Sequence, residues 1–278
     1  MNVGVGLPNT TPHSDGDLLV EWSRVADAGP FSSLAVLDRV LYDSFEPLTA
    51  LAAAAAVTER LRLATMIAIA PLRTTALLAK QSASIDALAG GRLTLGLAVG
   101  ARLDDYEATG VDHRRRGRVF TRQLAELREH WENGTIGPGP AQAGGPELLV
   151  GGAAGPSFER MARYADGYAH GGGPPRFFAR AAASANAAWR DLGRPGRPRL
   201  WGQAYFALGD QEVGNEYLRD YYAFTGPFAE RIVAGNLTTP RAIRDFVRGY
   251  EEEGCDELVL LPTVSEIDQL DRLAEVLA

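Results

Sequence analysis

The sequence is poor in the residues and segments that mark several classes of protein. Its single cysteine, Cys255, cannot form an internal disulfide and favours a cytoplasmic protein. Its four histidines lack metal-ligand spacing, so we predict no metal site. We expect neither a transmembrane helix nor a signal peptide, because no apolar run reaches about 18 residues and the start lacks a basic region followed by a long apolar core. The net charge of -7 argues against a general nucleic-acid binder.

Short apolar segments alternate with longer helical patterns along the chain. The segments that we expect to form strands are 3–7, 33–37, 62–70, 93–99, 147–150, 167–169, 200–208 and 257–261. Strand-helix alternation predicts a parallel sheet, and eight such units match an α/β fold of the (β/α)₈ TIM-barrel type. A doubly wound open sheet is the alternative, but no Gly-x-Gly-x-x-Gly follows the first strand. We expect one barrel domain over residues 1–278, with a lid or insertion at about 210–240.

The fourth expected strand, 93–99, has one bulky face and one nearly bare face. Because strand side chains alternate between faces, Gly96, Ala98 and Gly100 form a smooth stripe. Glycine inside a strand marks a bulge or the close approach of another group, so we expect something to press against this stripe. Asp104 and Asp105 follow the strand, where neighbouring acids can do acid-base work. A solvated turn or a helix cap is the alternative.

Two glycine runs follow the next two expected strands. "LLVGGAAGPS", residues 148–157, leads from a buried strand through a glycine pair into a helix start, where bare backbone N–H groups can bind an anion. The alternative is a tight turn that needs glycine only for its dihedral angles. "HGGGPP", residues 170–175, follows the neighbouring strand, and the two loops together favour a phosphate site.

Basic residues gather at the start of the long helix expected at about 116–132. The run "HRRRGR", residues 113–118, lies where a helix dipole disfavours cations. An anionic ligand tail would account for it. The alternative is that these arginines pair with nearby acids such as Glu107, Asp112 or Glu126.

Seven segments keep the order and spacing of one known family across nearly the whole chain. They are "VGVGLPN" (3–9), "SLAVLDR" (33–39), "EPLTALAAAAAVTERLRLATMIAIAPLR" (46–73), "LLAKQSASIDALAGGRLTLGLAVGARLDDYEATGVD" (77–112), "LLVGGA" (148–153), "YADGY" (164–168) and "GCDELVLLP" (254–262). Together they resemble the luciferase-like flavin-dependent oxidoreductase superfamily, which includes bacterial luciferase and enzymes that depend on the deazaflavin coenzyme F420.

The resemblance implies a barrel that holds a flat flavin or deazaflavin ring across its mouth, beside the ends of strands three and four. The stripe of small residues would leave room for the ring, and the cofactor phosphate would lie at the strand-five turn. A cis peptide bond that does not precede proline is implied at or within one bond of Met66–Ile67. The implied cofactor-binding residues are Met66, Ile67, Val99, Gly100, Asp104, Gly151, Gly152, Ala153, Ala154, Pro156 and Ser157.

The chain departs from the family at the acid-base positions. Where relatives carry a catalytic histidine after strand two, this chain has Arg39, preceded by Asp38, and where some carry a glutamate after strand four it has Ala101. Arginine stays protonated near neutral pH, so we predict that Arg39 stabilises an oxyanion or holds a substrate carboxylate. Asp38 would orient it through a bidentate pair. A structural ion pair at the barrel rim is the alternative.

The segment 210–240 follows strand seven and is rich in aromatic residues. We therefore expect it to form a substrate lid or pocket wall, the alternative being a dimer contact or a small satellite core. The predicted substrate-contacting residues are Tyr42, His170, Tyr221, Tyr222 and Phe224.

These features predict an oxidoreductase that transfers a hydride between a reduced deazaflavin (F420) or FMN cofactor and a small organic substrate. Coenzyme F420 is favoured because its phosphate-bearing acidic tail would use Arg102 and the arginines of 114–118. An FMN-dependent monooxygenase is one alternative, and a non-catalytic cofactor-binding or partner subunit is another. The resemblance also implies a homodimer, and we expect no nucleic-acid or membrane partner.

Overall fold

The strands form a closed parallel barrel. The computed structural model describes residues 1–134 and 136–278. Each strand pairs with the next in chain order, and β8 closes the barrel by pairing with β1. The strands are β1 Asn2–Gly6, β2 Ser33–Val36, β3 Arg62–Ile69, β4 Leu93–Ala98, β5 Glu147–Gly151, β6 Gly167–Ala169, β7 Arg199–Phe206 and β8 Glu257–Pro262. The predicted TIM barrel and its strands are confirmed, with ends shifted by one or two residues.

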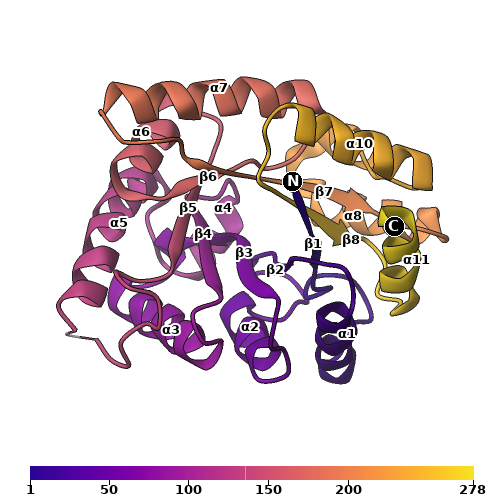
Figure 1. The fold of residues 1–278 in the computed structure, drawn as a ribbon, viewed down its shortest axis with the longest axis horizontal. Coiled ribbons are helices and arrows are strands. Elements are labelled where there is room, and N and C mark those ends of the chain that lie inside the picture. The colour runs from indigo at the N-terminus through magenta and orange to yellow at the C-terminus, as the bar shows by residue number, and fades with distance from the viewer. Residues whose placement is uncertain (135) are drawn as a thin grey trace.

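Helices surround this barrel on all sides (Figure 1). The outer helices are α1 Gly16–Ala28, α2 Pro47–Ala55, α3 Thr75–Leu88, α5 Arg116–Glu132, α6 Gly155–Tyr164, α7 Pro175–Asp191, α10 Pro240–Glu252 and α11 Asp268–Leu277. Local sequence sets several of their starts. The Asp15 side chain caps α1 by accepting from the Leu18 N–H, and Pro47 stands at the start of α2.

The apolar core has two layers because strand side chains alternate between the two faces of the sheet. Leu34, Leu95 and Leu258 belong to the layer between barrel and helices. Met66 and Trp201 belong to the smaller cluster inside the barrel. This alternation fixes which residues near the strand ends can face a ligand inside the barrel mouth.

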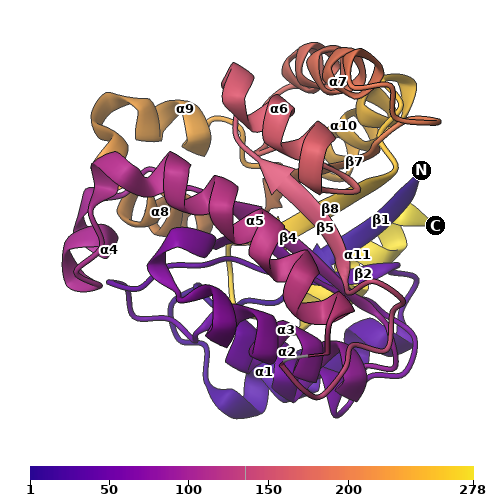
Figure 2. The ribbon, with the colours of Figure 1, turned by 90° about the vertical axis from the view of Figure 1, so that its left-hand side faces the viewer.

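Short helices gather at the carboxyl end of the barrel, away from both chain termini (Figure 2). The loop after β4 contains α4 Leu103–Ala108 and η2 His113–Arg115, where the sequence suggested only a turn or a cap. The segment after β7 contains α8 Gln211–Tyr221, η3 Ala223–Phe228 and α9 Ala229–Val233. We call Gln211–Val233 the lid segment.

Cys255 lies just before β8, at the amino end of the barrel. Its side chain is buried, and burial raises the pKa of its thiol to about 12, so the thiolate form is scarce near neutral pH. Among the described helices, none is long and apolar enough to cross a membrane.

Candidate active site

A bulge in β3 shapes the floor of the barrel mouth. The register of β3 against β4 shifts between Thr65 and Ala68, so that Met66 and Ile67 together face the single residue Gly96. The Met66–Ile67 peptide bond is cis, which confirms the bond that the family resemblance implied. Both side chains of the bulge line the cavity at the barrel mouth.

The stripe of small residues on β4 is covered by β3, which corrects the expectation that it leaves room for a cofactor ring. A Cβ at Gly96 would lie 2.2 Å from the Thr65 carbonyl oxygen and 3.0 Å from Ile67 Cγ2. A Cβ at Gly100 would lie 2.8 Å from Ile69 Cγ2, and one at Gly151 would lie 2.1 Å from Ile67 Cδ1. The glycines therefore make room for the bulged strand and for the side chains of Ile67 and Ile69.

A cavity of about 230 Å³ opens at the carboxyl ends of the strands. Predicted site residues that line it are Asp38, Arg39, Met66, Ile67, Gly100, Tyr221, Tyr222 and Phe224. Its other lining residues are Leu37, Ile69, Leu72, Ala101, Arg102, Asp105, Tyr106, Gly171 and Gln203. Ala101 lies at the position where some relatives are expected to carry a glutamate, and it supplies no acid.

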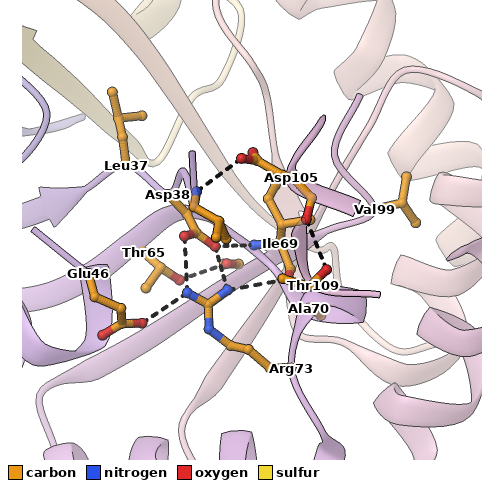
Figure 3. A network of polar contacts seen from close by, with 12 residues as sticks. Leu37, Asp38, Glu46, Thr65, Ile69, Ala70, Arg73, Val99, Asp105 and Thr109 are labelled. Carbon is orange, nitrogen blue, oxygen red and sulfur yellow. Dashed lines mark hydrogen bonds and ion pairs between the residues drawn. The ribbon is translucent and has the colours of Figure 1, made fainter. Parts of the chain in front are cut away.

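Asp38 is held by Arg73 and not by Arg39, which corrects the predicted pairing. The Arg73 guanidinium donates to both Asp38 oxygens, at 2.6 and 3.0 Å, and also to Glu46 at 2.9 Å (Figure 3). The backbone N–H of Ile69 donates to Asp38 at 2.7 Å. Burial would lower the pKa of Arg73, but the hydrogen bonds and charges of Asp38 and Glu46 raise it. The Asp38 carboxylate is therefore fully committed to fixing β2 against the end of β3.

Arg39 is buried without a carboxylate partner. It donates to the carbonyl oxygens of Tyr221 and Leu41, each at 3.0 Å. Its guanidinium carbon lies 4.1 Å from the ring centre of Tyr42 and 5.0 Å from that of Tyr221. Its Nε is buried and has no hydrogen-bond partner within the described chain. Burial and the nearby Arg102 charge lower the pKa of Arg39 from its ordinary value.

Asp105, and not the predicted Asp104, is the α4 acid that lines the cavity. Its carboxylate accepts from the backbone N–H groups of Val40 and Leu41 at 3.2 and 2.8 Å, and it lies 3.5 Å from Arg102 Nε. Asp104 is half-buried and pairs with the Arg102 guanidinium. Since α4 turns by about 100° per residue, adjacent acids face different ways, and only one can face the barrel.

The lid segment is anchored in the barrel mouth by the buried side chains of Tyr217, Leu218 and Tyr221, and its outer part makes a few further contacts with the rim. Besides the Arg39 bond to Tyr221, the Tyr42 hydroxyl donates to Asp220 at 2.7 Å, and the Arg102 guanidinium lies 4.5 Å from the Phe224 ring centre. Phe224 is 44% exposed. The lid segment thus roofs the cavity through polar and aromatic contacts and has little apolar packing at its tip.

Buried tyrosines lie beneath this roof. The Tyr205 and Tyr222 hydroxyls are 2.6 Å apart, and the Tyr217 hydroxyl is 2.7 Å from Thr10 Oγ1. Burial raises the pKa of Tyr205, Tyr217, Tyr221 and Tyr222 above the ordinary tyrosine value. Their hydroxyls stay protonated near neutral pH and can act as donors.

His170, predicted to contact substrate, lies outside the cavity lining. Its ring centre is 5.7 Å from that of Phe178 on α7 and 6.4 Å from that of Tyr250 on α10. Ala169 faces the barrel interior, so strand alternation turns the next residue toward the helices. Neither ring nitrogen of His170 has a well-formed hydrogen bond in the described residues. Burial lowers the pKa of His170, and its interaction with the Gly172 backbone opposes that shift.

The turn after β5 presents an open helix start. Gly152 has φ 121°, and Ala153, Ala154 and Pro156 are exposed. No side chain caps α6 at Ala154, so its first N–H groups have no side-chain acceptor. These residues do not line the 230 Å³ cavity, and neither does Val99, whose carbonyl oxygen accepts from Tyr106. An open helix start of this kind fits an anion.

The predicted basic cluster forms the wall of a second hollow beside α6. This hollow of about 590 Å³ is lined by Arg115, Arg118 and Arg122, among others. Arg160 of α6 lies beside the first turn of α5, with its Nη2 3.0 Å from where a Cβ of Gly117 would stand. Pairing with neighbouring acids is not what holds this cluster, because in the described chain the arginines of 114–118 form no ion pair.

Sequence reasoning missed several residues of the site. Arg73 and Gln203 gave no local signal, because their partners are distant in the chain. The Asp104–Asp105 pair did mark a turn at the cavity, which Asp105 lines, and a cofactor contact of Asp104 stays a prediction.

Comparison with known proteins places the chain among relatives. The family model for luciferase-like monooxygenases matches residues 1–254. The chain belongs to this family. A curated relative, an uncharacterised protein of Mycobacterium bovis, is 31% identical over 196 residues, which cover 58% of this chain and 68% of the relative.

Solved structures of the family have the same fold with either of two cofactors. An F420-dependent secondary alcohol dehydrogenase, solved with an F420–acetone adduct, aligns with TM-score 0.80 and 15% identity, over 99% of this chain and 97% of that one. The oxygenating constituent of 3,6-diketocamphane monooxygenase from Pseudomonas putida, solved with FMN, aligns with TM-score 0.72 and 15% identity, over 94% and 91%. The family thus binds flavin-type cofactors, and at such identities the alignments establish the fold alone.

Proposed function

We propose that the protein is an oxidoreductase that transfers a hydride between reduced coenzyme F420 and a small organic substrate. The observation that carries this proposal is that three features lie at the same end of the barrel. They are the bulged cavity floor, the uncapped start of α6 and the basic hollow at the start of α5. They offer, in order, a flat apolar surface, an anion site and a second site for negative charge.

The residues present fit a flavin-type cofactor. Met66, Ile67 and Gly100 would contact the ring, and the backbone N–H groups after Gly152 would hold the phosphate, with Ser157 at the helix start. When bound, a deazaflavin supplies the hydride and does not readily activate oxygen, so the chemistry is that of a reductase or dehydrogenase. The chain's own part is to bind, orient and exclude water.

The basic hollow supports coenzyme F420 over FMN. FMN ends at its phosphate, whereas F420 carries an acidic tail beyond it. Arg115 and Arg118 are exposed and have no ion-pair partner in the described chain; Arg115 ends η2, and Arg118 lies in the first turn of α5. An acidic tail that left the α6 start along this surface would meet their charge.

We assign the lid segment the role of closing the cavity over substrate. The cavity of about 230 Å³ is smaller than the roughly 300–1,000 Å³ of ligand pockets, so the segment must move for ring and substrate to fit together. Tyr222 lines the cavity and holds a proton at its hydroxyl, where it faces Tyr205. It can therefore donate to a substrate oxygen, a role for which Asp38 and Asp105 have no spare capacity.

Titration of F420 and FMN into the purified full-length chain tests the proposal. F420 should quench tryptophan fluorescence and raise Tm, because a ligand at about 100 times its Kd stabilises the native state by about 2.7 kcal/mol. The Arg115→Gln/Arg118→Gln variant should lose about tenfold in F420 affinity and keep any FMN affinity. Arg241→Gln, which changes a side chain that is 90% exposed, is the control.

Each other outcome selects another function. Preference for FMN would favour the monooxygenase. Binding of neither cofactor would favour a non-catalytic partner subunit.

A further inference from the structure

Arg39 is the one arginine of the cavity lining that forms no ion pair with a carboxylate of the described chain, and the charge of Asp105 acts on it only from beyond contact distance. Asp38 and Asp105, the two acids that line the cavity, are occupied by Arg73 and by Arg102 with two backbone amides. Arg39 meets only two neutral carbonyl oxygens and two tyrosine rings. A charge buried in this way is costly unless an opposite charge joins it.

The position of Arg39 is fixed before any ligand arrives. Its two hydrogen bonds and the flanking rings of Tyr42 and Tyr221 hold the guanidinium in one place. A guanidinium has five N–H donors, and only two of its hydrogen bonds are made here. Nε–H has no partner in the described residues, and with an adjacent N–H it forms the fork that matches a carboxylate.

The other residues that line the cavity indicate that the rest of the ligand is apolar. Leu37, Ile69 and Leu72 supply aliphatic wall, and Tyr222 and Phe224 supply aromatic wall. Arg102 lies near Arg39, but its charge is paired with Asp104 and Asp105, so Arg39 is the cation left for a ligand. Such a site suits a small apolar molecule that ends in one planar anion.

We propose that the substrate of this site is a small, largely apolar carboxylic acid, whose carboxylate binds Arg39 and displaces the Tyr221 carbonyl contact as the lid segment moves. This inference rests on the proposed function, since it assigns the substrate class of the same cavity. It accounts for arginine at the place where relatives of the family are expected to carry a histidine.

Benzoate and its neutral isostere benzamide test the inference by calorimetric titration of the full-length chain, with and without saturating cofactor. Wild type should bind benzoate at least about tenfold more tightly than benzamide. Arg39→Met should remove this preference and leave benzamide binding within about twofold, and Arg39→Lys should fall between them because lysine keeps the charge but loses the fork. Arg241→Met is the matched control and should behave as wild type.

The outcomes separate this inference from the proposed function. Equal affinity of wild type and Arg39→Met for benzoate overturns the carboxylate site, as does no benzoate binding to wild type at about 10 mM. A loss of cofactor affinity in Arg39→Met also overturns it, because Arg39 would then serve the cofactor. If neither F420 nor FMN binds while benzoate binding still depends on Arg39, the proposed function fails and the anion site stands. If circular dichroism shows that Arg39→Met is unfolded, the benzoate preference of Arg39→Lys alone tests the inference.

Discussion

The two ends of the barrel differ in how completely their buried polar groups are hydrogen-bonded. At the amino end, Glu257 accepts hydrogen bonds from Ser32 and Ser33 at 2.5 and 2.6 Å, and Thr94 accepts from Arg62 and donates to Glu147. At the carboxyl end, Arg39 Nε and Gln203 Oε1 have no hydrogen-bond partner in the described protein, and the His170 ring has no well-formed hydrogen bond beyond its interaction with the Gly172 backbone.

This difference separates stability from function along one barrel axis. Most buried polar groups at the amino end are satisfied, although Trp201 Nε1, on the residue that pairs with Glu257, has no partner in the described chain. An unsatisfied buried group costs about 1–3 kcal/mol. A fold keeps such groups where a ligand, a water molecule or a moving segment meets them. The carboxyl end of a TIM barrel is where active sites lie. One exception at that end is the Asp38–Arg73 pair, in which both Asp38 oxygens accept hydrogen bonds.

The largest effect on stability should come from removing the Asp38–Arg73 ion pair. Asp38→Ala should lower the free energy of unfolding by about 3–5 kcal/mol, because it leaves Arg73 partly buried beside a lost partner and frees the Ile69 N–H. Urea denaturation measures the loss. Glu46→Gln is the control, since Glu46 is more exposed and its loss of charge should cost less than about 1 kcal/mol. A stable Asp38→Ala protein that binds cofactor but has no turnover would instead make Asp38 a catalytic group.

The next effect tests the open start of α6. Ala154→Asp supplies the missing cap and should hold or raise Tm, since a capping side chain is worth about 0.5–2 kcal/mol. The same carboxylate would repel a cofactor phosphate, so F420 affinity should fall by about 30-fold or more, as a fluorescence titration would show. Ala154→Asn caps without charge and should keep most of the affinity. Equal affinity in both variants would mean that the phosphate lies elsewhere.

The sequence could predict the barrel because strand and helix patterns are local. It could also predict the cis bond at Met66, but only through resemblance to a family. The partner of Asp38 could not be predicted, since Arg73 lies on another element and only the folded chain brings the two residues together. His170 was misplaced for a different reason: one step along a strand reverses the face, and a three-residue strand offers too little pattern to fix it.

A smaller effect tests why β4 is bare on one face. Gly96→Ala should destabilise the protein by about 1–3 kcal/mol, because the new Cβ would press on the backbone of the β3 bulge at the Thr65 carbonyl. It should also weaken cofactor binding if the bulge supports the ring. Gly16→Ala, where nothing lies within 4 Å of the added Cβ, is the control and should change stability little. Thermal unfolding of both variants measures the difference. Equal Tm values would show that an added Cβ at Gly96 fits beside β3 without strain.

The smallest effect is the pH dependence that His170 gives to the carboxyl end. Burial lowers its pKa in the folded state, so near neutral pH the ring is uncharged in both states and adds no pH dependence. As the pH falls below about 6.5, the unfolded chain takes up a proton first, and stability declines until the lower pKa of the folded ring is reached.

Replacement by phenylalanine removes this titration while keeping a ring against Phe178 and Tyr250. Between pH 7 and pH 5, His170→Phe should therefore lose less stability than wild type. Urea midpoints at each pH measure this, with His13→Gln, a change at an exposed histidine, as the control. Parallel pH profiles for wild type and His170→Phe would mean that the ring stays hydrated or finds a hydrogen-bond partner. His170 would then not count among the unsatisfied buried groups at the carboxyl end of the barrel.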